Sequence, residues 1–193
     1  LHALWAAHQA AGLDPETAMA AMNSPHPAVR NWAIRLLGDA HGIHRGLGSR
    51  PRQAAAGGPS GLLPAAIMAA LVDRARIETD PEVLCQLLAT CRRLAAAQAL
   101  PLTVAVLSRD SAAADPYLPL MGWWVFESLI PSANDAVLAT FDDEAAWRAD
   151  AIRDQILPRL ARRLCLDDDR DLLAGMTRLF RKAPSAAAAE RLV

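Results

Sequence analysis

The sequence predicts an all-α fold, a right-handed α-solenoid of stacked helix pairs. A proline followed by an apolar helical face occurs three times, at residues 27–34, 81–88 and 116–123. Alanine, leucine and arginine are abundant, and all three favour helices. Repetition at intervals of a few tens of residues is typical of units that bury their apolar faces only against their neighbours. We therefore expect one repeat domain over residues 1–193, and the start within a helical pattern suggests a fragment of a larger protein.

The first part of the chain contains three predicted helices and an insertion loop. The first helix covers residues 1–11, and Gly12 ends it. Asp14 precedes a proline and is placed to cap the second helix, which runs to about residue 22. The third helix begins after a turn, and Gly38 closes its apolar stripe. The loop, at about residues 40–61, is rich in Gly, Pro, Ser and Arg and cannot bury enough apolar surface to hold regular structure.

Helical patterns return after the loop. Further helices are predicted at residues 62–76, 82–96, 100–109, 117–130, 135–141 and 144–164. Pro131 is expected to stop one of them, and Pro158 to kink the longest. A final helix begins near Asp169, with acidic residues at its start and basic residues at its end. The residues that we expect in the core are Val29, Trp32, Leu36, Val83, Leu87, Leu118 and Phe126.

Charge, apolar runs and cysteines limit the classes of partner. A net charge of −1 gives no general attraction to nucleic acid or to an anionic membrane, and no apolar run is long enough to span a bilayer. We therefore expect neither a nucleic acid nor a membrane as partner. Cys85, Cys91 and Cys165 form no motif for haem or redox chemistry, and we interpret them as buried apolar residues. They leave the redox compartment open.

Two histidines provide the only candidate metal site. His41 and His44 are three residues apart, a spacing at which two imidazoles on a helix can share a metal ion. Nearby glycines indicate a loop instead, and no third ligand is set by spacing, so we expect no metal here. A ligand- or metal-binding domain that uses the His41 and His44 loop remains the alternative hypothesis.

Sequence motifs of catalysis are missing from the chain. It has no Gly-x-Ser-x-Gly elbow, and its glycine-rich segment at residues 57–61 lacks the Lys-Ser/Thr ending of a phosphate-binding loop. Acidic pairs stand at helix starts, where capping explains them. We expect no catalytic and no cofactor-binding residue, and hence no enzymatic role for this segment.

Arginines and a tryptophan are the candidates for an interaction surface. Arg148, Arg159 and Arg163 can fall along one stripe of the predicted helix, and guanidinium groups recognise carboxylates or phosphates. Aspartates interleave with these arginines at helical contact spacing, which favours an ordinary solvated face. In the Trp123-Trp124 pair, one indole is expected to fill the core and the other to seal a joint between repeats. A solvent-exposed Trp124 would instead mark a partner site.

Several segments resemble HEAT-type repeats, which form an armadillo-type superhelix. They are residues 1–5, 25–39, 80–94, 115–120 and the Trp123-Trp124-x-x-Glu127 context. More narrowly, they are similar to the helical-repeat region of exported bacterial proteins of the PVC-type haem-binding CxxCH, or putative membrane-bound dehydrogenase, family.

That resemblance implies a setting and a role. In the family, the repeat region is joined to a sorbosone-dehydrogenase-like β-propeller and a c-type cytochrome module. The resemblance therefore implies a periplasmic or otherwise extracytoplasmic location, with haem c elsewhere in the parent protein. The Cys-x-x-Cys-His motif is missing from these residues, so no cofactor or catalytic position is carried over. The implied role is a non-catalytic scaffold whose partners are proteins or neighbouring domains of the same chain.

Overall fold

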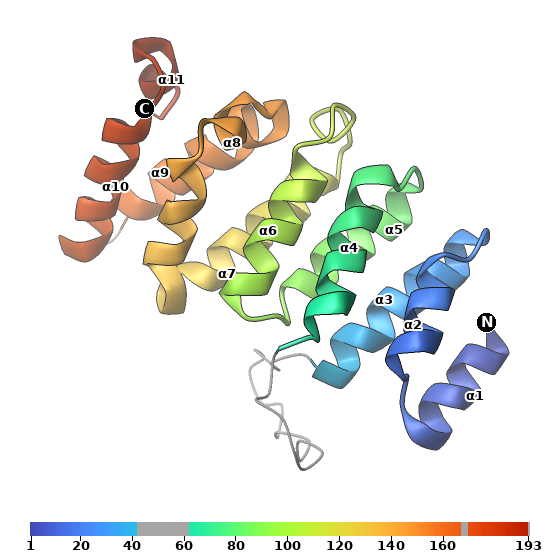
Figure 1. Ribbon diagram of the computed structural model, residues 1–193. Coiled ribbons are helices and arrows are strands. Elements are labelled where there is room, and N and C mark those ends of the chain that lie inside the picture. Colours follow the sequence, from blue (N-terminus) through green and yellow to red (C-terminus); the bar gives the residue numbers. More distant parts are fainter. Residues whose placement is uncertain (42–61, 167–169, 193) are drawn as a thin grey trace. The chain divides into compact units, whose positions relative to one another are not determined.

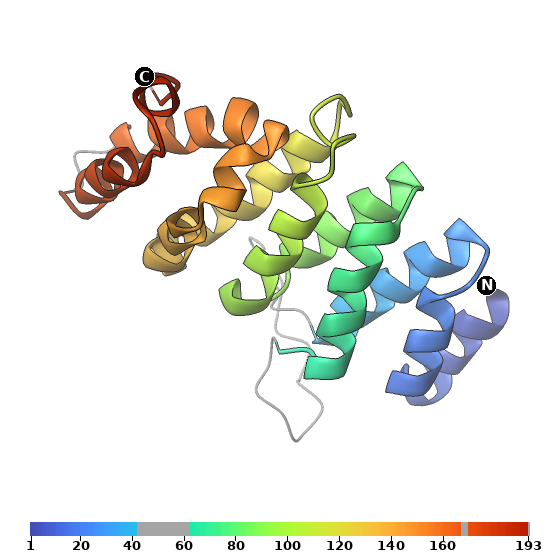
Figure 2. The same ribbon diagram turned by 45° about the horizontal axis from the view of Figure 1, so that its top comes forward.

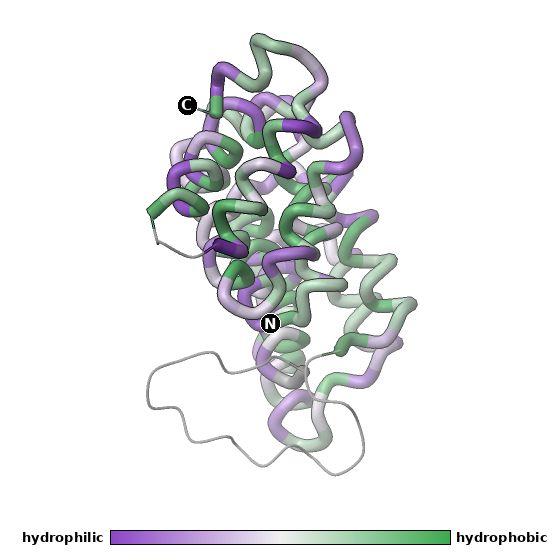
Figure 3. The backbone as a smooth tube through the Cα atoms, turned by 90° about the vertical axis from the view of Figure 1, so that its left-hand side faces the viewer, coloured by the Kyte–Doolittle hydropathy of each residue, from purple (hydrophilic) through white to green (hydrophobic). Residues whose placement is uncertain are grey.

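The computed structural model describes residues 1–41, 62–166 and 170–192 (Figure 1). The described residues form helices and connecting turns without a strand, so the all-α prediction is confirmed. Hydrophobic and hydrophilic stretches alternate along the helices (Figure 3), as in amphipathic helices that bury one side. The chain divides into two compact units, Leu1–Leu102 and Thr103–Val193, and each is described by itself.

The first unit contains helix pairs arranged in two layers. Its complete helices are α1 (His2–Ala11), α2 (Pro15–Met22), α3 (Pro27–His41), α4 (Ala65–Ile77) and α5 (Pro81–Cys91). Helix α2 packs against α3 of its own pair and against α4 of the next (Figures 1 and 2). Helices α3 and α5 likewise lie side by side. Successive pairs in this unit therefore bury their apolar faces against each other.

An aspartate followed by proline precedes helices in both units, and Asp14 caps its helix as predicted. Asp14 accepts a hydrogen bond from the backbone N–H of Thr17 at 2.9 Å. Asp80 accepts two backbone N–H bonds at the start of α5, at 3.0 and 3.1 Å. Asp115 does the same at the start of α7 (Leu118–Ala139), at 2.8 and 2.9 Å. Asp80 is the N-cap of α5, whereas Asp115 lies two residues before Tyr117, the N-cap of α7. The two aspartates therefore bond to the backbone in the same way, ahead of helices that begin at different distances from them.

The prediction that Gly38 ends the third helix is wrong, because α3 continues to His41. Gly38 lies instead where α3 approaches α5 closely. A Cβ atom at this position would be 2.9 Å from the Thr90 Cγ2 atom. The Thr90 hydroxyl donates a hydrogen bond to the carbonyl of Ile34 on α3, at 3.2 Å. Glycine is therefore required by packing between two helices and not by a helix C-terminus.

Helix α6 (Ala96–Leu107) begins four residues earlier than predicted and contains Pro101 within it. Its C-terminal part belongs to the second unit, together with α7, α8 (Glu144–Arg148), α9 (Leu157–Cys165), α10 (Arg170–Lys182) and α11 (Ala186–Glu190). Pro131 does not stop α7. The backbone leaves helical geometry two residues later, at Ala133, where φ is −151° and ψ is 37°.

The long helix predicted over residues 144–164 is also wrong. Helix α8 ends at Arg148, and the next residue, Ala149, has extended backbone with ψ of 117°. A π-helical turn, Ile152–Ile156, then leads into α9. Pro158 stands in the first turn of α9, where its missing N–H costs nothing, and so it does not kink a continuous helix.

Aromatic residues form the centre of the second unit. The rings of Phe126 and Phe141 lie 5.7 Å apart, and Trp147 meets Phe141 edge-on at 6.5 Å. The Trp147 indole N–H donates to the Phe141 carbonyl at 3.0 Å, so its polar group is satisfied inside the core. Helix α10 packs on α9 and on α7.

Some predicted core residues lie nearer the surface than expected. Leu36, Val83, Leu87, Leu118 and Phe126 are buried as predicted. Val29 and Trp32, by contrast, are only half-buried. The buried side of α3 consists of residues 30, 33, 34, 36, 37 and 38, so it includes Arg30 and Ile34, which the prediction left out. Among the cysteines, Cys91 is buried, Cys85 is half-buried, and Cys165 is exposed at the end of α9.

Candidate functional site

A buried ion pair joins the first two complete helix pairs. Arg30 of α3 and Glu78, which follows α4, are 7% and 1% exposed. The Arg30 Nε and Nη2 atoms donate to the two Glu78 carboxylate oxygens at 2.7 and 2.6 Å. This bidentate geometry is the strongest form of carboxylate recognition by arginine. We call the pair the Arg30–Glu78 clamp.

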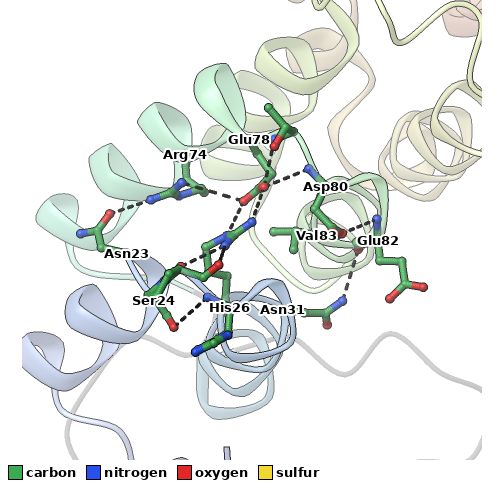
Figure 4. Close-up of polar contacts among 12 residues, drawn as sticks. Asn23, Ser24, His26, Asn31, Arg74, Glu78, Asp80, Glu82 and Val83 are labelled. Carbon is green, nitrogen blue, oxygen red and sulfur yellow. Dashed lines mark hydrogen bonds and ion pairs between the residues drawn. The ribbon is translucent and has the colours of Figure 1, made fainter.

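The remaining hydrogen-bonding groups of the clamp are also used. Arg30 Nη1 donates to the carbonyls of Ser24 and Pro25, in the turn before α3, at 2.9 and 3.2 Å. Glu78 accepts the backbone N–H groups of Thr79 and Asp80, in the turn before α5, at 2.9 and 3.0 Å (Figure 4). The clamp therefore ties together the turns of two successive helix pairs.

Surrounding contacts extend this connection. Arg74 of α4 lies 3.9 Å from the Glu78 carboxylate and donates to the Asn23 side chain at 2.7 Å (Figure 4). Asn31 of α3 donates to the carbonyl of Glu82 at 3.4 Å, which joins the starts of α3 and α5 (Figure 4).

The electrostatics of the clamp suit a structural tie. Burial by itself would raise the pKa of Glu78, but hydrogen bonds from Arg30 and from the backbone of Asp80 and Thr79 outweigh it and hold the pKa below its usual value. The Glu78 hydrogen bond in turn raises the pKa of Arg30. A general acid or base needs a pKa near the working pH, and this pair is shifted away from it.

The predicted arginine stripe is divided between two helices. Arg148 belongs to α8 and lies 3.3 Å from the Glu144 carboxylate, with both side chains exposed. Arg159 and Arg163 belong to α9, and Arg159 donates to the Gln155 carbonyl at 3.0 Å. Because backbone breaks separate α8 from α9, the spacing argument for one continuous basic stripe does not hold.

Neither tryptophan of the Trp123-Trp124 pair fills the core. Trp123 is half-buried, and Trp124 is 41% exposed. Val125, Phe126 and Leu129 of the same helix are fully buried and occupy the core in their place. The exposed Trp124 thus meets the condition set above for a partner site.

Trp124 belongs to a larger exposed side of α7. Tyr117, just before the helix, is 65% exposed, and Leu120 is 37% exposed. Glu127, one turn beyond Trp124, is exposed as well. We call these four residues, Tyr117, Leu120, Trp124 and Glu127, the α7 stripe. The sequence analysis missed the stripe, although its spacing of three, four and three residues places it on one side of a helix.

An aromatic ladder in the first unit gives His2 a structural role. The His2 ring meets Trp5 edge-on at 5.4 Å, and Trp5 meets Trp32 edge-on at 4.8 Å. The Arg35 guanidinium lies 4.9 Å from the centre of the Trp32 ring, a cation–π distance. The ladder joins α1 to α3.

Most of the histidine loop on which the metal hypothesis depends lies outside the described part of the chain. His44 is not among the described residues, and of His41 only the backbone, the last residue of α3, is described. Within residues 1–41, 62–166 and 170–192, no cluster of three His, Cys, Asp or Glu side chains is arranged to hold a metal ion. Over the same residues, no helix combines the length and apolarity needed to cross a membrane.

Comparison with protein-family models, with curated proteins and with solved structures gives no match for this chain.

Proposed function

We propose that the chain is a HEAT-like α-solenoid that serves as a non-catalytic scaffold for binding proteins or neighbouring domains. The observation that carries the proposal is the packing of successive helix pairs in the first unit, where α2 meets α4 and α3 meets α5. The Arg30–Glu78 clamp connects the two pairs at their turns. In repeat proteins of this kind each unit contacts its neighbours, and the array offers an extended binding surface.

Two further observations support this function. Asp80 and Asp115 each accept hydrogen bonds from the backbone N–H groups two and three residues later, as expected if both belong to equivalent positions of a repeat. The α7 stripe exposes a tryptophan and a tyrosine together, and these residue types are enriched where proteins bind each other.

The proposal also includes the type of parent protein and its location. We infer an exported parent protein of the c-type-cytochrome or dehydrogenase-like type, with this segment outside the cytoplasm and haem c bound elsewhere. The support is the resemblance of residues 25–39 and 115–127 to that family. A Cys-x-x-Cys-His motif in the flanking reading frame would support this setting, and a complete parent gene without one would contradict it.

The solenoid is tested by distances between spin labels in the full chain. Labels are placed at the starts of successive proline-led helices, in a background of Cys85→Ala and Cys165→Ser. The Ala28→Cys, Glu82→Cys pair is the reference, because α3 and α5 lie side by side. The Glu82→Cys, Tyr117→Cys pair is the test.

Helix axes in contact lie about 8–10 Å apart, so both label pairs should show strong dipolar coupling at roughly 10–20 Å. A distance of several tens of Å for the second pair alone would contradict a continuous stack of these three helices.

A further inference from the structure

We propose that the α7 stripe binds an amphipathic helix of a partner protein, with apolar residues along one side and an arginine or lysine at one end. This inference rests on the proposed scaffold function and names the chemistry of the partner. The stripe consists of Tyr117, Leu120, Trp124 and Glu127, all exposed.

The geometry of the stripe matches the side of another helix. With a rise of about 1.5 Å per residue, Tyr117 to Trp124 spans about 10 Å and Tyr117 to Glu127 about 15 Å. A partner helix with apolar residues at the same spacing can place one against each of Tyr117, Leu120 and Trp124. Tyrosine and tryptophan offer large contact areas with few rotatable bonds, which suits them as binding anchors.

The charge of Glu127 distinguishes between possible binding partners of this surface. Glu127 is exposed at one end of the stripe, and among the described residues no hydrogen bond or ion pair is found for its side chain. Helix α7 contains Glu127 and Asp135 but no lysine or arginine. A basic residue on the partner would therefore complete the site, because charged groups across an interface are arranged to be complementary.

The same charges disfavour two other occupants. A second copy of the chain, docked through its own α7, would bring no basic residue from that helix to Glu127. An anionic membrane attracts basic side chains near its surface, and the stripe offers a carboxylate instead.

The experiment measures binding of a defined peptide to the full chain by fluorescence anisotropy. The probe is a labelled alanine-based helical peptide of about 16 residues, long enough to be substantially helical. It carries leucines spaced by three and four residues and an arginine three residues beyond. The comparison peptide has glutamate in place of that arginine.

Each variant of the stripe has a matched control elsewhere. Trp124→Ala removes the central anchor, and Leu166→Ala removes an apolar side chain that is 75% exposed outside the stripe. Glu127→Gln removes the charge, and Glu16→Gln makes the same change at an exposed position of α2. Thermal unfolding followed by circular dichroism establishes that each variant is folded.

The proposal predicts tighter binding of the arginine peptide than of the glutamate peptide. Trp124→Ala should weaken binding at least about tenfold, as expected of a central anchor. Glu127→Gln should weaken binding of the arginine peptide by about two- to fivefold and abolish the preference between the two peptides. Leu166→Ala and Glu16→Gln should change neither the affinity for the arginine peptide nor the preference between the two peptides.

Several results would overturn the inference. They are no binding by the wild-type chain, equal binding of the two peptides, or equal effects of Trp124→Ala and Leu166→Ala. Self-association or binding to anionic vesicles that depends on Trp124 would assign the stripe to another occupant and overturn it too. The outcome is separable from that of the scaffold proposal, because the label distances test the stacking of helices without any peptide.

Discussion

Replacing Glu78 by glutamine should lower the free energy of unfolding by about 3 kcal/mol, as estimated for an ion pair broken inside a protein. Arg30 is 7% exposed and directs two hydrogen bonds to the Glu78 carboxylate, at 2.7 and 2.6 Å. Glutamine retains one oxygen, so one charge-assisted bond is lost, at a cost of about 1.5–3 kcal/mol. The buried guanidinium also loses the carboxylate that it pairs with. The expected loss of unfolding free energy is therefore near the upper end of that range.

The prediction is checked by urea unfolding, followed by both far-ultraviolet circular dichroism and tryptophan fluorescence. Glu144→Gln is the matched control, because Glu144 pairs with Arg148 at 3.3 Å on the surface of α8. An exposed pair of this kind contributes only about 0.3–0.5 kcal/mol. If Glu78→Gln costs no more than Glu144→Gln, the clamp does not stabilise the protein as argued.

A double-mutant cycle separates the pair from its surroundings. Arg30→Met alone leaves the Glu78 carboxylate with the backbone donors of Thr79 and Asp80. In Arg30→Met, Glu78→Gln, neither member of the clamp carries a charge, so the double variant should be more stable than the sum of the single effects predicts. We expect a coupling of about 2–3 kcal/mol, and strict additivity would contradict a direct interaction.

Three further predictions concern pH, packing and capping. Because the pKa of Glu78 is lower in the folded protein, its stabilising contribution is complete above the unfolded pKa of about 4.3 and is lost as the pH falls through the folded pKa. Between about pH 5 and pH 3 the wild type should therefore lose more stability than Glu78→Gln, and parallel unfolding curves against pH would disprove this. Gly38→Ala should cost about 1 kcal/mol because of Thr90, and less in a Thr90→Ser background that lacks the Cγ2 atom; thermal melts would show it. Asp80→Ala and Asp115→Ala should each cost about 1 kcal/mol in urea unfolding, and a cost near zero at either site would argue against the cap.

Local chemistry made the helix starts predictable. An aspartate followed by proline satisfies free N–H groups and begins a helix within a few residues, whatever the rest of the chain does. Asp14 therefore has the predicted role in the structure, and Asp80 and Asp115 make similar bonds that were not predicted. The expected apolar stripe of α3 was correct at Ala33, Leu36 and Leu37, but it left out Arg30, and this omission hid the clamp. Arg30 occupies the same side of the helix as Ala33, Ile34 and Leu37.

An arginine at an apolar position indicates a buried partner, so Arg30 could have been found from the sequence. Glu78 is 48 residues away, across the insertion loop, and helical periodicity does not relate residues at that distance. The interruption of the helix at Ala149 also could not be predicted from the local sequence. Residues 144–157 have good helix propensity, and the interruption follows directly on the burial of Trp147 and its hydrogen bond to Phe141. Tertiary packing overrides intrinsic propensity there.

The α7 stripe was predicted in part, through Trp124 alone. The arginine stripe failed because it assumed one continuous helix across the break at Ala149. Spacing arguments are valid only within an uninterrupted helix, and the α7 stripe, unlike the arginines, lies ahead of the irregular backbone at Ala133.

Two cysteine thiols make local opening of the first unit measurable without any substitution. Cys91, in α5, is fully buried, whereas Cys165 is exposed in the second unit. An alkylating reagent reaches a thiol only when it is accessible, so Cys165 should react at once and Cys91 only during openings of its surroundings. Mass spectrometry after a short labelling pulse would thus count these openings directly, with Cys165 as an internal standard for reagent activity.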